Sequence, residues 1–446
     1  MNKRTVVIAG AAAAALAGAA VLLPNANASP DKSAEAKTFS SQSAVKLATA
    51  LASDLGDNAA GWYYQGDTRR LVMNVLSEDA ANDVRAKGAV AKVVENSMAE
   101  LKATTKTLSD TASIPGTAWS IDPKTNKVRV TADRTVTGTK WATLTKAVDG
   151  LAGKATVQRT NGEFRKLDGT DETQPGADGG AGQGGADDGA GQGAGQGGAD
   201  DGAGQGAGDG QGAGDGQGAG DGQGAGDGQG GGDGQGAGNG QGAGGAGEQA
   251  GALDGGDAIF GGGARCSLGF NVTVDGAPAF LTAGHCGNIA ETWATDQAGA
   301  QQVGTTAESQ FPVSDFALVT YDDPNTQAPS TVDLQDGTTQ EITRVAEASV
   351  GLAVRRSGST TGVTDGTVTG LNATVNYGNG DIVNGLIQTD VCAEPGDSGG
   401  AMFAEDAAVG LTSGGSGDCT QGGETFFQPV STALEATGAV IGAGNP

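Results

Sequence analysis

Residues 253–446 predict an all-β sandwich or double barrel, preceded by a small α+β region and a glycine-rich linker. Three observations predict this organisation. In the last region the apolar runs are short, glycine-rich turns such as 376–380 separate them, and helical spacing occurs only around 431–436. Residues 29–167 alternate helical and β-rich apolar runs. Residues 174–258 contain no aromatic or β-branched side chain, so they cannot bury enough apolar surface to fold.

Residues 1–28 predict a secretory signal. Lys3 and Arg4 precede an alanine-rich apolar run over 6–23, and 26–28 form an A-x-A cleavage site. A transmembrane anchor is the alternative, because about 18 apolar residues nearly span a bilayer. We expect cleavage, export to the extracellular medium and no membrane contact afterwards.

The region 29–167 predicts a small domain with its own core. Helical apolar spacing marks its first helix, and two strands follow around a turn at 65–67. We expect helices over 43–55, 78–88, 96–110 and 138–152, and strands over 61–64, 71–76, 117–121, 127–133 and 154–160.

The region 168–252 repeats Asp-Gly-Gln-Gly-Ala-Gly from about residue 209. A calcium-binding β-roll is the alternative to a disordered linker, since its repeats also use glycine and aspartate. Such repeats need a large apolar residue each, and these have none. We therefore expect a flexible linker.

Charge divides the chain. Residues 29–167 have 20 basic and 15 acidic side chains, whereas 253–446 have 23 acidic side chains and four arginines, and the intervening linker has 14 acids and no base. An acidic last domain argues against nucleic acid as a partner, because nucleic-acid binding needs clustered lysine and arginine. The opposite charges favour docking of the first region on the last.

All four cysteines lie in the last region. An even number in an exported chain indicates two disulfides. Three connectivities are possible, and we favour the nearest-neighbour pairing, Cys266 with Cys286 and Cys392 with Cys419. Zinc is disfavoured because no Cys-x-x-Cys spacing occurs and the only histidine adjoins Cys286. We expect no metal and no cofactor.

Two motifs indicate acyl-transfer chemistry. Ser398 lies in Pro-Gly-Asp-Ser-Gly-Gly, and His285, the only histidine, lies in Thr-Ala-Gly-His-Cys. A serine hydroxyl needs a base to remove its proton, and His285 is the one imidazole available. Asp315 opens an apolar strand, so it is the acid best placed to be buried and to orient that imidazole. The N–H groups of Gly396 and Ser398 are the candidate oxyanion hole. The order His, Asp, Ser is that of chymotrypsin-type enzymes and differs from that of α/β-hydrolases and subtilisins.

With these motifs in hand, the last region resembles the streptogrisins, secreted bacterial serine endopeptidases of the chymotrypsin fold. The resemblance covers nearly all of 253–446. It is carried by segments 266–272, 281–286, 357–362, 371–377, 391–400, 411–417 and 426–430.

The resemblance implies an all-β double six-stranded barrel (chymotrypsin-like) with the site between the barrels. It implies the disulfide pairing favoured above. It also implies that 29–167 is an alpha-lytic-protease-like propeptide, a folding catalyst and inhibitor removed on maturation. Arg356 matches the buried arginine that pairs with Asp397 in the bacterial enzymes, so activation would mean losing the propeptide. A buried carboxylate without a cation would be costly.

Substrate selection is expected to depend on the walls of one pocket. Gly414 and Gly415 leave its entrance open, and their backbone can pair with a peptide. The candidate substrate-binding residues are Ser413, Gly414, Gly415, Ala393, Glu394, Pro395 and Thr425. The family pattern implies cleavage after Phe, Tyr, Leu or Met. Glutamate-specific relatives place histidines in the pocket, and this chain has no second histidine. Asp390, two residues before Cys392, leaves a trypsin-like preference as the alternative.

The end of the propeptide-like region suggests its own mode of inhibition. Leu167 would suit an apolar pocket, so we expect the tail 163–167 to occupy the active site, and the mature terminus to lie near Leu253. We expect a monomer that acts on proteins and peptides. A catalytically dead binding protein and a secreted matrix protein with the glycine tract as its working part are the rival hypotheses.

Overall fold

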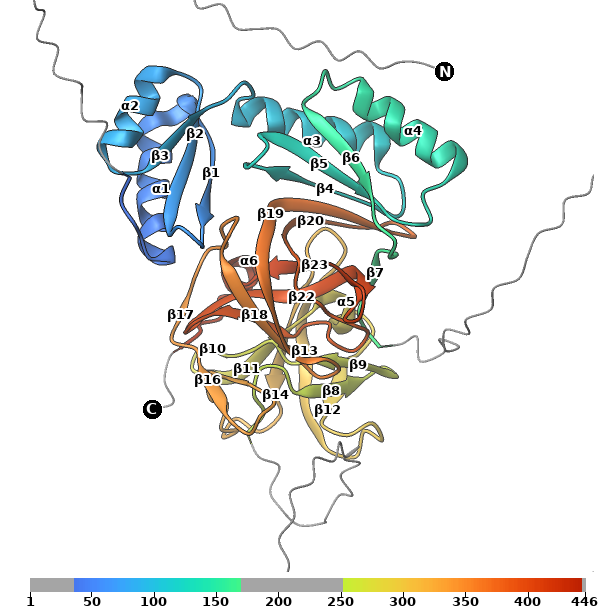
Figure 1. Cartoon of the computed structure of the whole chain (residues 1–446). Helices are drawn as coiled ribbons and strands as arrows, with labels where there is room; N and C mark the ends of the chain where they lie inside the picture. The colour runs from blue at the N-terminus through green and yellow to red at the C-terminus, as the bar shows by residue number, and fades with distance from the viewer. Residues whose placement is uncertain (1–35, 170–251, 443–446) are drawn as a thin grey trace, which may run out of the picture. The chain divides into compact units, whose positions relative to one another are not determined.

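The computed structural model describes residues 36–169 and 252–442 (Figure 1). The expected signal at 1–28 lies outside these residues, and so does nearly all of the expected linker at 168–252. Among the described residues, no helix has the length and apolar character needed to cross a bilayer.

The first lobe, residues 36–94, packs two helices against a three-stranded sheet. Strands β1 and β2 are antiparallel, and β2 and β3 are parallel. The core contains Leu51, Leu71, Met73 and Val84. The elements are α1 (Ser41–Leu55), the short 3-10 helix Gly56–Asn58, β1 (Ala59–Gln65), β2 (Arg70–Val75), α2 (Glu78–Ala86) and β3 (Val90–Val93).

The second lobe repeats the same order of elements and the same strand directions. Strands β4 and β5 are antiparallel, and β5 and β6 are parallel. Its first helix begins with a capping box, in which the Ser97 hydroxyl accepts from the Glu100 N–H and the Glu100 carboxylate accepts from the Ser97 N–H. The elements are α3 (Met98–Ala112), β4 (Thr117–Asp122), β5 (Lys127–Ala132), α4 (Gly138–Asp149) and β6 (Ala155–Arg159).

The helices and strands expected in 29–167 all occur, within a few residues of their expected ends. Two further strands occur that the sequence pattern did not predict, β3 and β7 (Arg165–Lys166). Both are short and lack the alternation that marks a longer strand, so their pairing with β2 and β22, respectively, defines them.

The first half of the last region forms a seven-stranded sheet in the order β10-β11-β14-β13-β12-β8-β9. The resemblance implied six strands here. The difference arises because Gly262 and Gly263 both have positive φ, +61° and +83°, and so make a two-residue turn that pairs β8 with β9. The strands are β8 (Ala258–Gly261), β9 (Ala264–Ser267), β10 (Phe270–Val274), β11 (Ala277–Thr282), β12 (Thr292–Ala294), β13 (Gln302–Gln310) and β14 (Phe316–Tyr321).

The second half forms a closed barrel of six strands. They follow the order β18-β21-β22-β23-β20-β19, and β18 also pairs with β19 to close the circle. A hairpin of β15 (Thr331–Asp333) and β16 (Thr339–Glu341) and the short β17 (Arg344–Val345) lie between the two halves in sequence, and β17 pairs with β22. The six strands are β18 (Ala353–Gly358), β19 (Gly362–Gly378), β20 (Asp381–Thr389), β21 (Ala401–Ala404), β22 (Ala407–Asp418) and β23 (Gly422–Pro429).

Two short helices complete this region, α5 (Gly284–Gly287) and α6 (Val430–Thr437). The sequence predicted only α6. Disulfides join Cys266 to Cys286 and Cys392 to Cys419, which are the nearest-neighbour pairs.

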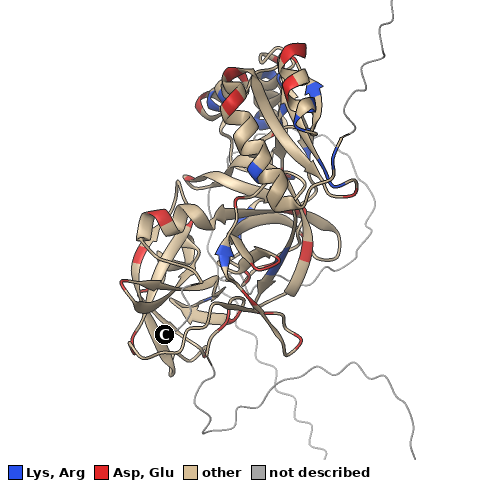
Figure 2. Ribbon diagram, turned by 90° about the vertical axis from the view of Figure 1, so that its left-hand side faces the viewer, with Lys and Arg blue, Asp and Glu red and all other residues tan. Residues whose placement is uncertain are grey.

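Two strands of the first region pair directly with the second barrel. Strand β4 is antiparallel to β19, so the sheet of the second lobe continues into the barrel. Strand β7 is antiparallel to β22. Figure 2 shows that basic side chains are frequent in residues 36–169 and sparse in 252–442.

Candidate functional site

Three side chains from separate elements meet in one hydrogen-bonded row. His285 lies on α5, Asp315 immediately precedes β14, and Ser398 lies in the turn before β21. Nδ1 of His285 lies 3.0 and 2.9 Å from the two carboxylate oxygens of Asp315, and its Nε2 lies 2.7 Å from Oγ of Ser398. All three are buried. The imidazole can therefore take a proton from the hydroxyl while the carboxylate holds its other nitrogen.

The position of His285 depends on Gly284, the residue that precedes it. A Cβ at Gly284 would lie 2.1 Å from the carbonyl oxygen of Gln310, so α5 can lie this close to β13 only with glycine there. The short helix thereby brings the imidazole against the start of β14. A helix of four residues has no periodic pattern, which is why the sequence did not predict it.

The Asp315 carboxylate is buried with hydrogen-bond donors around it. Oδ1 accepts from the backbone N–H of His285 at 2.9 Å, and Oδ2 accepts from the hydroxyl of Ser413 at 2.6 Å. The backbone N–H of Asp315 donates to Oε1 of Gln428 at 2.8 Å. The hydroxyl of Tyr377 lies 3.2 Å from Oγ of Ser413, and burial raises the pKa of Tyr377. These contacts fix the carboxylate toward the imidazole and offset part of the cost of burying it.

Two backbone N–H groups converge on one carbonyl oxygen. The N–H of Gly396 lies 2.7 Å and that of Ser398 3.1 Å from the carbonyl oxygen of Leu167. Gly396 has a φ of +101°, and a Cβ there would lie 2.2 Å from Oγ1 of Thr360, so only glycine fits. Two N–H donors that converge on one carbonyl oxygen can polarise that carbonyl.

A buried ion pair supports the turn that carries Ser398. Nη1 of Arg356 lies 3.0 Å from Oδ1 of Asp397, and both side chains are fully enclosed. Asp397 also accepts from the backbone N–H groups of Thr360 and Glu394, each at 2.9 Å. Burial lowers the pKa of Arg356, and the charge of Asp397 opposes that effect. The pair neutralises two charges that would be costly if single.

The end of the first region lies in the site as an added strand. Lys166 and Arg165 of β7 pair with Gly414 and Gly415 of β22. A Cβ at Gly414 would lie 2.3 Å from the carbonyl oxygen of Arg165, so glycine is needed for this approach. Leu167 is 6% exposed, and its carbonyl oxygen is the one that the two N–H groups hold. The carbonyl of Leu167 therefore lies against the backbone of the turn that carries Ser398.

The expected pocket residues have differing contacts. Gly414 and Gly415 pair with the tail, whereas the hydroxyl of Ser413 donates to Asp315. The Thr425 hydroxyl donates to the carbonyl oxygen of Val391 at 2.6 Å. Of the remaining expected residues, Ala393 is buried, Glu394 accepts from the Cys419 N–H, and Pro395 is exposed.

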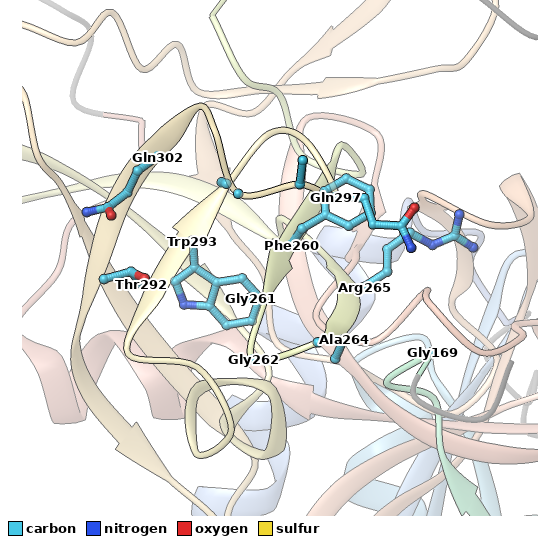
Figure 3. Close-up of a pocket in the computed structure, with 14 residues that line it drawn as sticks. Gly169, Phe260, Gly261, Gly262, Ala264, Arg265, Thr292, Trp293, Gln297 and Gln302 are labelled. Atoms are coloured by element: carbon cyan, nitrogen blue, oxygen red, sulfur yellow. The ribbon is translucent and has the colours of Figure 1, made fainter.

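Other residues at the site were not predicted from the sequence. Tyr377 and Gln428 belong to segments that carried the resemblance, but no local pattern marks their contacts. A cavity of about 520 Å³ begins at Gly169, two residues past Leu167. Figure 3 shows the residues that line it, among them Phe260, Arg265, Trp293, Gln297 and Gln302. They come from β8, β9, β12, the adjoining loop and the start of β13, so no motif could have grouped them.

Three family models match the chain. The model described as alpha-lytic protease pro N-terminal matches residues 32–94, and the alpha-lytic protease prodomain model matches 96–152. These ranges correspond to the two lobes of the first region. The trypsin model matches residues 271–437.

Curated relatives match the whole chain or its last region. Streptogrisin-D of Streptomyces griseus is 46% identical over 443 residues, which cover 99% of this chain and 91% of the relative. Streptogrisin-A of the same organism is 37% identical over 77% of this chain and 86% of the relative. Glutamyl endopeptidase 2, also of Streptomyces griseus, is 49% identical over 40% of this chain and 94% of the relative.

Proposed function

The chain is a serine endopeptidase that belongs to the streptogrisin family, and from this premise we propose that His285, Asp315 and Ser398 are its catalytic triad. The observation that carries the proposal is the carbonyl of Leu167, which lies on the N–H groups of Gly396 and Ser398. A peptide carbonyl held there is polarised next to the hydroxyl that would attack it.

The proposed reaction follows from the contacts of each group. Oγ of Ser398 attacks the substrate carbonyl carbon as Nε2 of His285 takes its proton, and the two N–H donors stabilise the negative oxygen. Asp315 holds the Nδ1–H of the imidazole and stabilises the imidazolium. His285 then protonates the leaving amine. A water deprotonated by the same imidazole hydrolyses the acyl-enzyme and regenerates Ser398.

The precursor organisation supports a zymogen. We propose that 1–28 is a signal for secretion, 29–167 the propeptide, 168–252 a linker and 253–446 the protease domain, which acts as a monomer. The Arg356–Asp397 pair is already complete with the propeptide present, so activation needs no new terminus at Asp397. Removal of the tail from the site is then the activating event.

A large apolar residue is the proposed preference at the cleaved position, here called P1. Leu167 supports it, since this leucine is buried with its carbonyl on the oxyanion donors. The trypsin-like alternative requires Asp390 to line the P1 pocket. Asp390 remains exposed while Leu167 is bound, and its Oδ1 accepts from the Thr367 N–H at 2.6 Å. The family scaffold also carries a relative named for glutamyl cleavage, so similarity alone leaves P1 open.

Hydrolysis of peptides that differ only at P1 tests this function. The secreted, processed protein should cleave after Phe, Tyr, Leu and Met at least about tenfold faster than after Lys, since a buried unpaired charge in an apolar pocket costs more than 1.4 kcal/mol. A fluorophosphonate should label Ser398. Ser398→Ala should lower kcat by about 10⁶. A preference for Lys or Arg would favour the Asp390 hypothesis, and an unlabelled, inactive protein would favour a binding role.

A further inference from the structure

We infer that Asp381 makes this protease select a basic residue at P2, the position just before the cleaved residue. The inference rests on the proposed function, because it assigns P1 to the residue whose carbonyl lies on the oxyanion donors. Leu167 is then at P1 and Lys166 at P2.

The register of β7 places Lys166 where the P2 residue of a bound substrate would lie. Lys166 pairs with Gly414 in an antiparallel ladder, while the Leu167 carbonyl is held by the N–H groups of Gly396 and Ser398. A peptide that binds by strand addition and presents its carbonyl to the same donors must follow the same path. Its P2 side chain then lies where the Lys166 side chain lies, because side chains alternate along a strand.

Two residues of the protease domain contact the Lys166 ammonium. Its Nζ lies 2.9 Å from Oδ2 of Asp381, the first residue of β20. The same Nζ lies 5.2 Å from the ring centroid of Phe311. The Phe311 ring in turn contacts the His285 imidazole edge to face, with centroids 5.7 Å apart. The P2 side chain thus passes the Phe311 ring, which contacts the proposed catalytic base His285. Its charged end then pairs with the Asp381 carboxylate.

The environment favours a cation at this position. The side chains of Lys166 and Asp381 retain 33% and 23% of their exposure, so water is partly excluded from the pair. Among the described residues, Lys166 is the only ion-pair partner of Asp381. The domain 253–446 has four arginines and no lysine. Once the tail leaves, Asp381 therefore presents a negative charge that a basic P2 side chain can neutralise.

The first experiment compares peptides with leucine at P1 and lysine, norleucine or glutamate at P2, cleaved by the secreted, processed protein. Norleucine keeps the apolar stem of lysine and lacks its charge. Lysine should exceed norleucine in kcat/KM by about twofold to fivefold at low salt, as a partly exposed ion pair predicts. The difference should appear mainly in KM and should shrink at about 1 M NaCl. Glutamate should be the poorest.

Asp381→Asn should abolish the preference for lysine over norleucine, whereas Glu405→Gln should retain it. Glu405→Gln is the matched control, because Glu405 is an exposed acid at the turn between β21 and β22 and its loss removes the same charge. In the full chain, Asp381→Lys should slow cleavage after Leu167, and adding Lys166→Glu should restore it.

Equal rates for lysine and norleucine, or a preference that survives in Asp381→Asn, would overturn the inference. Either outcome with normal cleavage after leucine leaves the proposed function intact. Loss of all cleavage together with loss of fluorophosphonate labelling in the unmodified protein would instead contradict the proposed function. The two failures are therefore distinguishable.

Discussion

Asp315 shows which contacts a carboxylate needs in order to be buried while it carries a charge. The sequence singled it out because it opens the apolar strand β14, and the structure places it beside His285. Its remaining contacts, with Ser413 and with the backbone of His285, come from elements far away in sequence. Ser413 was expected to line the substrate pocket. Its hydroxyl instead donates to Asp315, because the backbone of β22 directs the Ser413 side chain inward. A sequence motif does not show that direction.

Asp257 is a second acid whose environment has a measurable consequence. Burial and the nearby charges of Asp254 and Asp333 raise its pKa from 3.8 to about 6. The folded state therefore favours the protonated acid, so this contribution to stability is complete below pH 3.8 and is lost as the pH rises through about 6. We expect Asp257→Asn to raise the free energy of unfolding at pH 7 by about 1 to 3 kcal/mol and to flatten its pH dependence between 4 and 6.

Denaturant unfolding of the processed protein at several pH values measures this effect. Asp336→Asn is the control, because hydrogen bonds from Thr338 lower the pKa of Asp336. Its contribution is present at neutral pH and is lost as the pH falls, so its removal changes the profile in the opposite sense. An Asp257→Asn profile that matches the unmodified protein would contradict the assigned role of this acid.

Among the elements, β7 and α5 determine the site more than the long strands do. Both are too short to carry a periodic pattern, and β7 is a strand only because β22 lies beside it. The sequence nevertheless predicted that residues 163–167 would occupy the site, from the apolar character of Leu167, the opposite charges of the two regions and the resemblance of 29–167 to an inhibitory propeptide. No sequence pattern predicted the pairing of β4 with β19, because the folded sheets determine which strand edges remain free to pair.

The position of β7 predicts the first cleavage of the precursor. Because the Leu167 carbonyl lies on both oxyanion donors, the bond between Leu167 and Asp168 should be cut before any other. The expected new terminus is Asp168, followed by a second terminus near Leu253. Leu167→Asp should slow the first cut by at least about tenfold, because it buries a charge in place of an apolar side chain.

A time course of N-terminal sequencing and intact mass on the secreted protein follows these cuts. Ser398→Ala should accumulate uncut precursor, which separates self-processing from cleavage by other proteases. Lys37→Met, a change in the first lobe far from β7 in sequence, should leave the order unchanged. A first terminus well inside residues 258–442 would refute the assignment of β7 as a bound substrate.

At the scale of the whole molecule, the two regions have opposite net charges but form few ion pairs with each other. In the described part of the chain, Lys166–Asp381 is the one ion pair that joins 36–169 to 252–442. The other contacts are backbone ladders, side-chain hydrogen bonds such as Ser120 Oγ to Gln388 Oε1 at 2.7 Å, the attraction between Arg129 and the buried Glu424, and apolar packing such as Phe164 edge to face on Phe426 at 5.6 Å. The sequence shows that the two regions have opposite net charges. The fold determines which charged side chains form ion pairs.

This distribution predicts how the separated propeptide inhibits the mature enzyme. Residues 29–167 added in trans should inhibit competitively, and deletion of 164–167 should raise the inhibition constant by about 100-fold, because it removes the β7 ladder and two buried apolar side chains. Raising NaCl from about 0.1 to 1 M should raise the constant by less than about tenfold, mainly through slower association, since long-range charge steers encounter more than it holds the complex. Stopped-flow association and steady-state inhibition separate the two effects. If salt weakens inhibition more than the deletion does, paired charges rather than the tail hold the propeptide on the enzyme.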